Sequence, residues 1–215
     1  MKELTYTLLS DGSSDQALLP ILTWLLRTQG LKSAIQPEWA DLQYLPRPPR
    51  TLPERIGRTL ELYPCDVLFV HRDAEAASPA VRANEILQAI ETVIQQQVSV
   101  PPRVCVVPVR MQEAWLLFDE AAIRVAAGNR HGTMPLDLPP IDTLEQLSDP
   151  KRVLYDLLRA ASGLMGRRRK QFRAQKHARR VAEFITDFSA LRTLSAFNRL
   201  EADIGQIVHE HGWDR

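Results

Sequence analysis

The run Val67-Leu68-Phe69-Val70, followed at once by His71-Arg72-Asp73-Ala74-Glu75, decides the fold of this chain. Four consecutive apolar residues rich in strand-forming side chains are typical of a short strand that is covered on both faces. The charged residues directly after them mark the end of that strand. A strand of this kind belongs to a sheet with helices on either side, so the stretch predicts an α/β protein with a mainly parallel sheet.

The segments on either side repeat the pattern of a strand followed by a helix. Upstream, Leu4–Leu9 predicts a strand, and residues 16–27 predict a helix that Gly30 ends. Downstream, Ser78 and Pro79 are typical of the cap and the first position of a helix. This alternation predicts a Rossmann-like sheet with right-handed crossovers. The other expected elements are an extended strand within 33–45, helices over 53–62 and 78–97, a buried strand over 104–109 and a helix over 112–119.

The pattern changes near residue 125. Residues 126–150 are rich in glycine and proline, which predicts a long ordered loop in which short strand pieces can form. After this loop the pattern is helical, with the two clearest helices over 151–161 and 171–187 and a shorter one within 188–200. We therefore expect an α/β domain over residues 1–125, and a loop and C-terminal helical subdomain over 126–215 that packs on it.

Acidic residues follow three of the expected strands. Asp11-Gly12 comes after the first strand, Asp73-Ala74-Glu75 after the strand at 67–70, and Glu113 after the strand at 104–109. The carboxyl ends of parallel strands meet at one edge of a sheet, where open α/β sheets bind ligands. Mg²⁺ prefers hard oxygen ligands such as carboxylates. We expect Asp11, Asp73 and Glu75 to bind Mg²⁺ or Mn²⁺ at this edge.

Three neighbours of these acids are candidates for a chemical role. Glu113 would serve as an additional ligand or a general base, and His71 as a general base or a phosphate contact. Arg110 would neutralise charge in a transition state. Each residue also has a structural interpretation: Glu113, like Asp15, can stabilise a helix start, the histidine can be a packed core residue, and the arginine can balance acidic neighbours.

Residues 166–180 carry no acidic side chain and eight Lys or Arg residues. In a chain whose net charge is only +1, this local excess indicates a surface that follows a phosphate backbone, with affinity that depends strongly on salt. Helical spacing would place Arg169, Arg173, Lys176 and Arg180 on one side. A solvated helix face is the alternative. The residues expected to contact DNA or RNA are Arg167, Arg168, Arg169, Lys170, Arg173, Lys176 and Arg180.

Length and composition set the remaining limits. The 215 residues, 45% of them apolar, allow one core, or one core with a small helical piece. Cys65 and Cys105 lie beside or within apolar runs, which indicates reduced thiols in the cytoplasm and no disulfide scaffold. The N-terminal residues are typical of neither a signal peptide nor a membrane span, and no stretch approaches about 18 apolar residues. No membrane is expected among the partners.

At the acidic residues the sequence resembles the TOPRIM superfamily, the metal-binding domain of topoisomerases, DnaG-type primases and overcoming-lysogenization-defect nucleases. That pattern has an acid followed by glycine after the first strand, here Asp11-Gly12, and two acids spaced by one after a later strand, here Asp73-Ala74-Glu75. The TOPRIM part covers about residues 1–120. TOPRIM enzymes usually carry Glu where Asp11 stands and Asp where Glu75 stands, so both ends of the pattern differ in side-chain length.

More narrowly, the chain resembles a family of small bacterial TOPRIM-like proteins known as domain of unknown function 4276. The residues that carry this resemblance are Gln112-Glu113-Ala114-Trp115-Leu116-Leu117 and Asp149-Pro150-Lys151. The resemblance covers nearly the whole chain. It implies Mg²⁺-dependent nucleic-acid chemistry through the superfamily, and no established reaction through the narrower family.

Together the residues and the resemblance predict a Mg²⁺-dependent nuclease or a related phosphodiester-transfer protein. The alternative is a non-catalytic module of the same fold that binds nucleic acid, nucleotide or protein, which the altered acidic pattern favours. An enzyme that acts on a small phosphorylated molecule is a third interpretation, in which the loop at 126–150 shapes the pocket.

Overall fold

Four short apolar runs form a parallel sheet at the centre of the molecule. In the computed structural model, which describes residues 3–214, they are β1 (Leu4–Leu9), β2 (Ile35–Trp39), β3 (Val67–His71) and β4 (Arg103–Val106). All neighbours pair in parallel, in the order β2-β1-β3-β4. Every residue of β3 is buried, as its apolar composition requires. The predicted class, a mainly parallel α/β sheet flanked by helices with a C-terminal helical extension, is confirmed.

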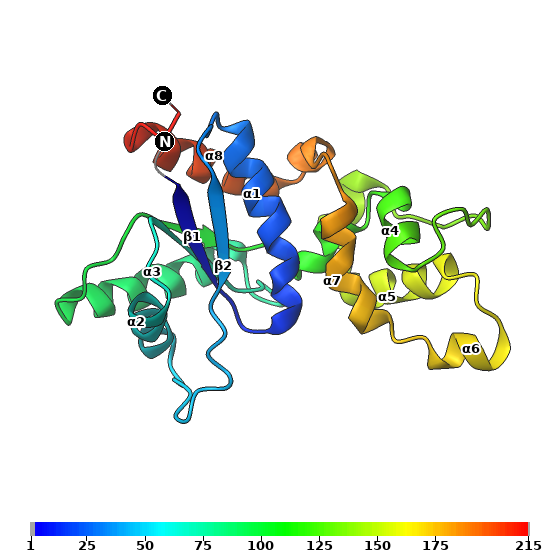
Figure 1. The fold of residues 1–215 in the computed structure, drawn as a ribbon, viewed down its shortest axis with the longest axis horizontal. Helices are drawn as coiled ribbons and strands as arrows, with labels where there is room; N and C mark the ends of the chain where they lie inside the picture. The colour runs from blue at the N-terminus through cyan, green and yellow to red at the C-terminus, as the bar shows by residue number, and fades with distance from the viewer. Residues whose placement is uncertain (1–2, 215) are drawn as a thin grey trace.

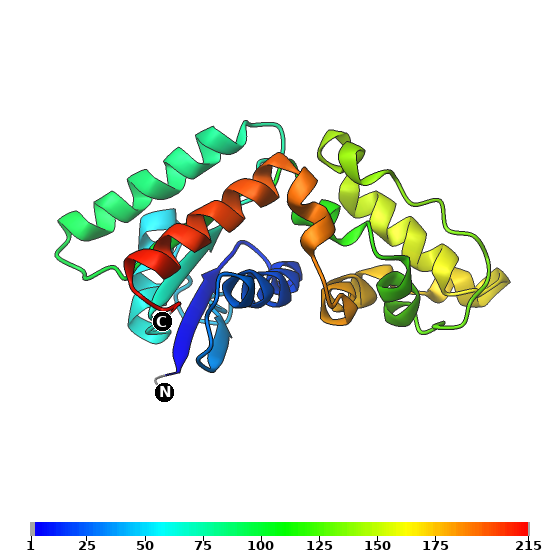
Figure 2. The same cartoon turned by 90° about the horizontal axis from the view of Figure 1, so that it is seen from above.

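Helices cover both faces of the sheet (Figures 1 and 2). On one face lie α1 (Leu18–Thr28) and α8 (Ser195–Glu210), and on the other α2 (Leu52–Leu62) and α3 (Pro79–Gln95). Because side chains alternate along a strand, one set of residues faces each layer. Thus Phe69 packs in the larger apolar cluster with α1 and α8, whereas Leu68 and Val70 pack in the cluster with α3.

Local signals account for most helix starts, and they also explain where the predicted boundaries were wrong. Ser78 caps α3, with Pro79 at its first position, as the sequence predicts. Residues 16 and 17, expected to begin the first helix, belong instead to a 3-10 turn, η1 (Ser13–Ala17), and α1 begins at Leu18. The expected strand over 104–109 stops at Val106, shortly before Pro108, which has no N–H for a sheet hydrogen bond.

The helical extension differs from prediction in its details. The helix expected over 171–187 is present as α7 (Ala174–Phe184), but both of its predicted ends are wrong. At its start the chain leaves the preceding helix at Phe172, whose backbone is extended and whose ring stacks on His177 at 4.5 Å between centroids. Residues 126–150 contain a 3-10 helix, and no strand is assigned there. The elements are η2 (Gln112–Leu116), α4 (Glu120–Ala126), η3 (Ile141–Gln146), α5 (Pro150–Ala161), α6 (Gly166–Gln171), α7 (Ala174–Phe184) and η4 (Ser189–Thr193).

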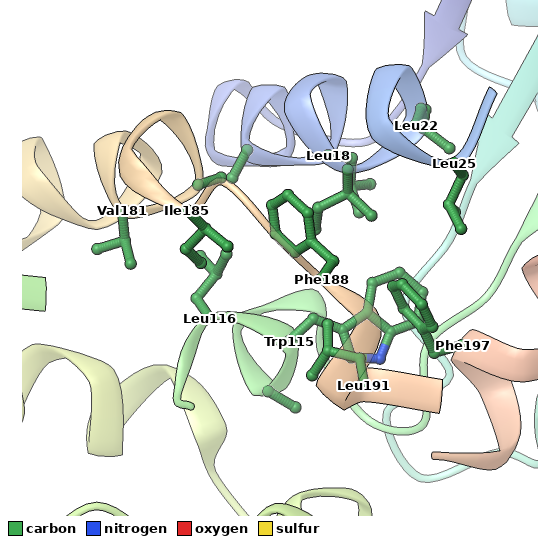
Figure 3. Close-up of a cluster of buried hydrophobic side chains, with 14 of the residues drawn as sticks. Leu18, Leu22, Leu25, Trp115, Leu116, Val181, Ile185, Phe188, Leu191 and Phe197 are labelled. Atoms are coloured by element: carbon green, nitrogen blue, oxygen red, sulfur yellow. The ribbon is translucent and has the colours of Figure 1, made fainter. Parts of the chain in front are cut away.

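One apolar core joins the sheet to the extension (Figure 3). Trp115 is fully buried and meets the ring of Phe197 edge-on at 5.4 Å, while Phe188 packs edge-on against Trp24 of α1. Within the extension α4 packs on α5 and α7, and α8 returns to the sheet beside β4. The division near residue 125 stays a prediction. Among residues 3–214, no helix is both long and apolar enough to cross a membrane.

Candidate functional site

The strand order reverses between β1 and β3, and a polar cavity lies at the carboxyl ends of these two strands. In open α/β sheets this switch point is where ligands bind. The cavity has a volume of about 280 Å³. The loop after β1, the loop after β3, the start of α3 and the start of α5 contribute to its wall. Its lining residues are Asp11, Gly12, Ser14, Asp15, His71, Arg72, Asp73, Glu75, Arg82 and Lys151.

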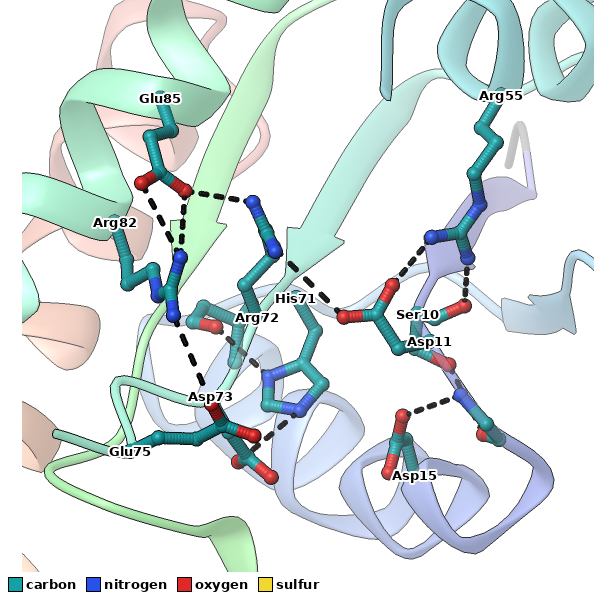
Figure 4. Close-up of polar contacts among 12 residues, drawn as sticks. Ser10, Asp11, Asp15, Arg55, His71, Arg72, Asp73, Glu75, Arg82 and Glu85 are labelled. Carbon is teal, nitrogen blue, oxygen red and sulfur yellow. Dashed lines mark hydrogen bonds and ion pairs between the residues drawn. The ribbon is translucent and has the colours of Figure 1, made fainter. Parts of the chain in front are cut away.

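Asp73 lies at the centre of this arrangement, directly after β3 (Figure 4). Its Oδ1 accepts a hydrogen bond from the backbone N–H of Gln112 at 3.0 Å and lies 3.4 Å from Nε2 of His71. Burial raises the pKa of Asp73 to about 6; attraction to His71 opposes this shift, and the nearby carboxylates of Glu113 and Asp15 add to it. The negative charge of Asp73 therefore lowers the stability of the folded protein, and a bound cation would remove this loss of stability.

Asp15 is a buried residue of the site. The sequence predicted only that it caps a helix. Its Oδ2 accepts from the backbone N–H of Gly12 at 2.9 Å, so the capping role is present. Its Oδ1 also accepts from Nε2 of Gln112 at 2.9 Å. Gln112 thus connects Asp15 to Asp73 through its side chain and its backbone. The signal in the sequence was the spacing of Asp15 from Asp11, one helical turn along the chain.

The structure does not bring the three predicted metal ligands together. Asp11 is half-exposed and paired with Arg55, and its other oxygen lies 3.8 Å from Nε of Arg72. Glu75 is mostly exposed and turns toward Arg82, at 3.7 Å (Figure 4). In the part of the chain that the structure describes, no three Asp, Glu, His or Cys side chains stand close enough to hold a metal ion. The metal assignment stays a prediction.

Glu113 does not line the cavity, and it forms an ion pair that the sequence did not predict. Its side chain is only 4% exposed, and its Oε1 lies 3.1 Å from Nζ of Lys151. Its other oxygen is buried with no hydrogen-bond partner within residues 3–214. Burial works against the charge of Lys151, yet the Glu113 carboxylate outweighs it and raises the pKa of the lysine. Lys151 is the first residue after Pro150 at the start of α5.

The other two residues with predicted chemical roles differ in position. His71 is 2% exposed, and its Nδ1 lies 2.9 Å from the backbone oxygen of Val106, so it is fixed in place behind Asp73. Arg110 does not line the cavity, and its side chain is exposed. Its backbone oxygen instead accepts a 2.9 Å hydrogen bond from the N–H of Glu75.

That hydrogen bond joins two residues in the left-handed backbone region, where side chains other than glycine are disfavoured. Glu75 has φ of 52° and Arg110 has φ of 64°. Each such residue lowers the stability of the folded protein by about 1 kcal/mol, and strained backbone of this kind is concentrated at functional sites. The loops after β3 and β4 are therefore held in a specific, strained arrangement beside the cavity.

The basic segment lies close to this edge of the sheet. All seven residues predicted to bind nucleic acid are exposed. Of these, Arg180 pairs with Glu183 at 3.7 Å, and none of the other six forms an ion pair with a described residue. The buried face of α7 packs on η1, the turn that carries Asp15. The break at Phe172 separates Arg169, on α6, from the basic residues of α7, so they do not share one helix face.

A larger groove, of about 1000 Å³, runs along β4 between α3 and α8. None of the acidic residues discussed above lines it, so it is separate from the candidate site, and its wall mixes apolar with polar side chains. Comparisons of the chain with models of protein families, with curated proteins and with solved structures found no match.

Proposed function

We propose that this protein is a Mg²⁺-dependent phosphodiester hydrolase that acts on nucleic acid at the cavity between the ends of β1 and β3. The observation that carries the proposal is the polar cavity at the switch point of the sheet, which carboxylates from two separate loops line. Asp11 and Asp15 come from the segment after β1 and Asp73 from the segment after β3. Glu113 of η2 does not line the cavity but lies near enough to raise the pKa of Asp73. The TOPRIM-like order of Asp11-Gly12 and Asp73-Ala74-Glu75 supports the same chemistry.

The donor chemistry of the cavity fits Mg²⁺. Its acidic side chains are all carboxylates, and Mg²⁺ commonly takes one or two protein carboxylates and fills its other positions with water and substrate phosphate. A three-carboxylate cage is therefore not required. The buried Glu113 oxygen without a partner and the unfavourable charge of Asp73 both favour a nearby cation. Asp73 and Asp11, which both line the cavity, are the residues that would hold it.

The bound ion would supply a hydroxide-generating and charge-neutralising centre for the phosphoryl group. The residues of the chain contribute position and charge. His71 and the N–H of Gln112 hold the Asp73 carboxylate in one orientation. Arg72 and Arg82 are fixed by Glu85, at 2.6 and 3.0 Å, on the wall of the same cavity. Fixed cations of this kind stabilise negative charge that develops on phosphate oxygens.

The exposed basic residues of α6 and α7 provide the surface for a nucleic-acid strand. Six of them form no ion pair with the described residues, so their charge is available to phosphates. Because the buried face of α7 packs on η1, this basic helix is a direct neighbour of the segment that carries Asp15. A small phosphorylated molecule would not need this surface.

A titration with Mn²⁺ and a cleavage assay test the proposal. The wild-type protein should bind Mn²⁺ and cleave a labelled oligonucleotide only when the ion is present. Asp73→Asn, which removes the charge but keeps the shape, should lower Mn²⁺ affinity by about tenfold or more and abolish cleavage. Glu91→Gln, at an exposed site on α3, is the matched control. Absence of Mn²⁺ binding, or unchanged cleavage by Asp73→Asn, would contradict the proposal.

The second candidate is a non-catalytic nucleic-acid-binding module of the same fold. One observation favours it: the carboxylates already have partners within the protein, since Arg55 and Arg72 hold Asp11 and Lys151 holds Glu113. Such a module would bind oligonucleotide with a steep salt dependence but show no turnover with any divalent ion. The same pair of measurements therefore distinguishes the two candidates.

A further inference from the structure

Lys151 has an unusual position for a lysine on a helix. It stands in the first turn of α5, where the helix dipole disfavours a positive charge. It is also the only cavity-lining residue within the described chain that comes from the segment after residue 125. Its side chain thus extends from the helical extension to a cavity that the sheet otherwise forms.

The position of its ammonium group is set by Glu113. Nζ lies 3.1 Å from Oε1 of Glu113, a side chain that is 96% buried, while the Lys151 side chain is 37% exposed. An ammonium group has three donors, and this contact uses one of them. The buried carboxylate therefore fixes the position of the lysine, which lines the cavity and is partly exposed.

A purely structural ion pair explains this geometry poorly. A buried pair is weak evidence for stability, because well-packed apolar residues usually do as well. Here one partner is buried and the other opens into a polar cavity beside Asp73. Arg72 and Arg82 also line the cavity, and Glu85 fixes both of them from α3. Lys151 is the cation that the helical extension adds to this wall, and two of its three donors are not used by Glu113.

We propose that Lys151 binds a phosphate oxygen of the ligand in this cavity, and that Glu113 is a positioning residue that holds the lysine there. Lys151 thus takes the charge-neutralising role that the sequence predicted for Arg110, which does not line the cavity, and Glu113 acts through the lysine. The inference deepens the proposed function, because it names the residue that binds the phosphate of the phosphodiester, but it does not depend on turnover.

Binding of inorganic phosphate, measured by calorimetry on the full-length protein without divalent ions, tests the inference. Lys151→Met should weaken phosphate binding by roughly ten- to hundredfold, the range for one charge-assisted hydrogen bond. Lys32→Met, which removes an exposed lysine outside the cavity, should bind phosphate as the wild type does. Mn²⁺ affinity should not fall in either variant.

Removal of Lys151 alone leaves Glu113 buried and unpaired, which can destabilise the fold. The double variant Lys151→Met with Glu113→Gln removes both charges, and a thermal melt verifies that it is folded. It should show the same loss of phosphate affinity. Wild-type affinity in either folded variant, or no phosphate binding by the wild-type protein, would overturn the inference. Neither result would affect the Mn²⁺ titration, which tests the proposed function separately.

Discussion

Replacement of Asp73 by Asn should make the folded protein more stable at neutral pH while it removes function. Asp73 is largely buried, and its pKa is raised from 3.8 to about 6. This rise in the pKa corresponds to about 3 kcal/mol, which is the largest amount by which the charged form of Asp73 can lower the free energy of unfolding. The wild-type protein bears this loss whenever the carboxylate is ionised and no cation is bound.

The sign follows from the two states of Asp73. The folded protein binds the proton of the Asp73 carboxyl more tightly than the unfolded chain does. Protonation therefore stabilises the folded state, and this stabilisation is complete below pH 3.8. It is lost as pH rises through the window from 3.8 to about 6. Asparagine keeps an oxygen for the N–H of Gln112 but loses the attraction to His71. We therefore expect a gain of about 1–2 kcal/mol at pH 8, well under the upper limit of about 3 kcal/mol.

Thermal denaturation without divalent ions measures this gain. At pH 8 the melting temperature of Asp73→Asn should exceed that of the wild type by about 2–6 °C. At pH 5 the two proteins should differ by much less, because most of the wild-type Asp73 is protonated. Glu91→Gln should show no such dependence on pH. A lower melting temperature for Asp73→Asn at pH 8, or an equal difference at both pH values, would refute the reasoning.

Two further predictions concern the partners of the site. Replacement of Arg173 and Lys176 on α7 by Gln should weaken oligonucleotide binding and reduce the slope of log affinity against log salt by about 1.4 for a single strand; Lys32→Gln is the control, and an unchanged slope argues against the basic surface. Phosphate and Mn²⁺ should also strengthen each other's binding by about fivefold or more. Four carboxylates and three Lys or Arg residues line the cavity, so either ion bound alone disturbs the balance of positive and negative charge there. Calorimetric titration of each ion with and without the other measures this coupling, and independent binding would contradict it.

The fold was predictable because its signals are local. The buried run at β3 and the cap at Ser78 each act within a few residues, and each predicted its element correctly. The break between α6 and α7 was not predictable in this way. It depends on the stacking of Phe172 on His177 and on the bond from Nδ1 of His177 to the oxygen of Ala126, about fifty residues earlier. Helical periodicity carries no information about such contacts.

The site shows the same division. Its place at the ends of β1 and β3 follows from the strand pattern, and Asp73 was found because it comes directly after a strand. The orientation of Asp11 and Glu75 was not predictable, because it is set by arginines from other elements. Arg55 of α2 draws Asp11 aside, and Arg82 of α3 does the same for Glu75.

The position of Lys151 shows why a site of this kind is assembled from distant parts of the chain. Charges inside a cavity must balance closely, since an unpaired buried charge costs several kcal/mol. The cavity wall carries four carboxylates from the loops after β1 and β3, but only two arginines from the sheet and its flanking helices. The helical extension adds Lys151 to this wall, where α5 packs on η2 and the lysine meets Glu113. The extension is therefore part of the site, and a fragment that ended near residue 125 would lack its phosphate-binding cation.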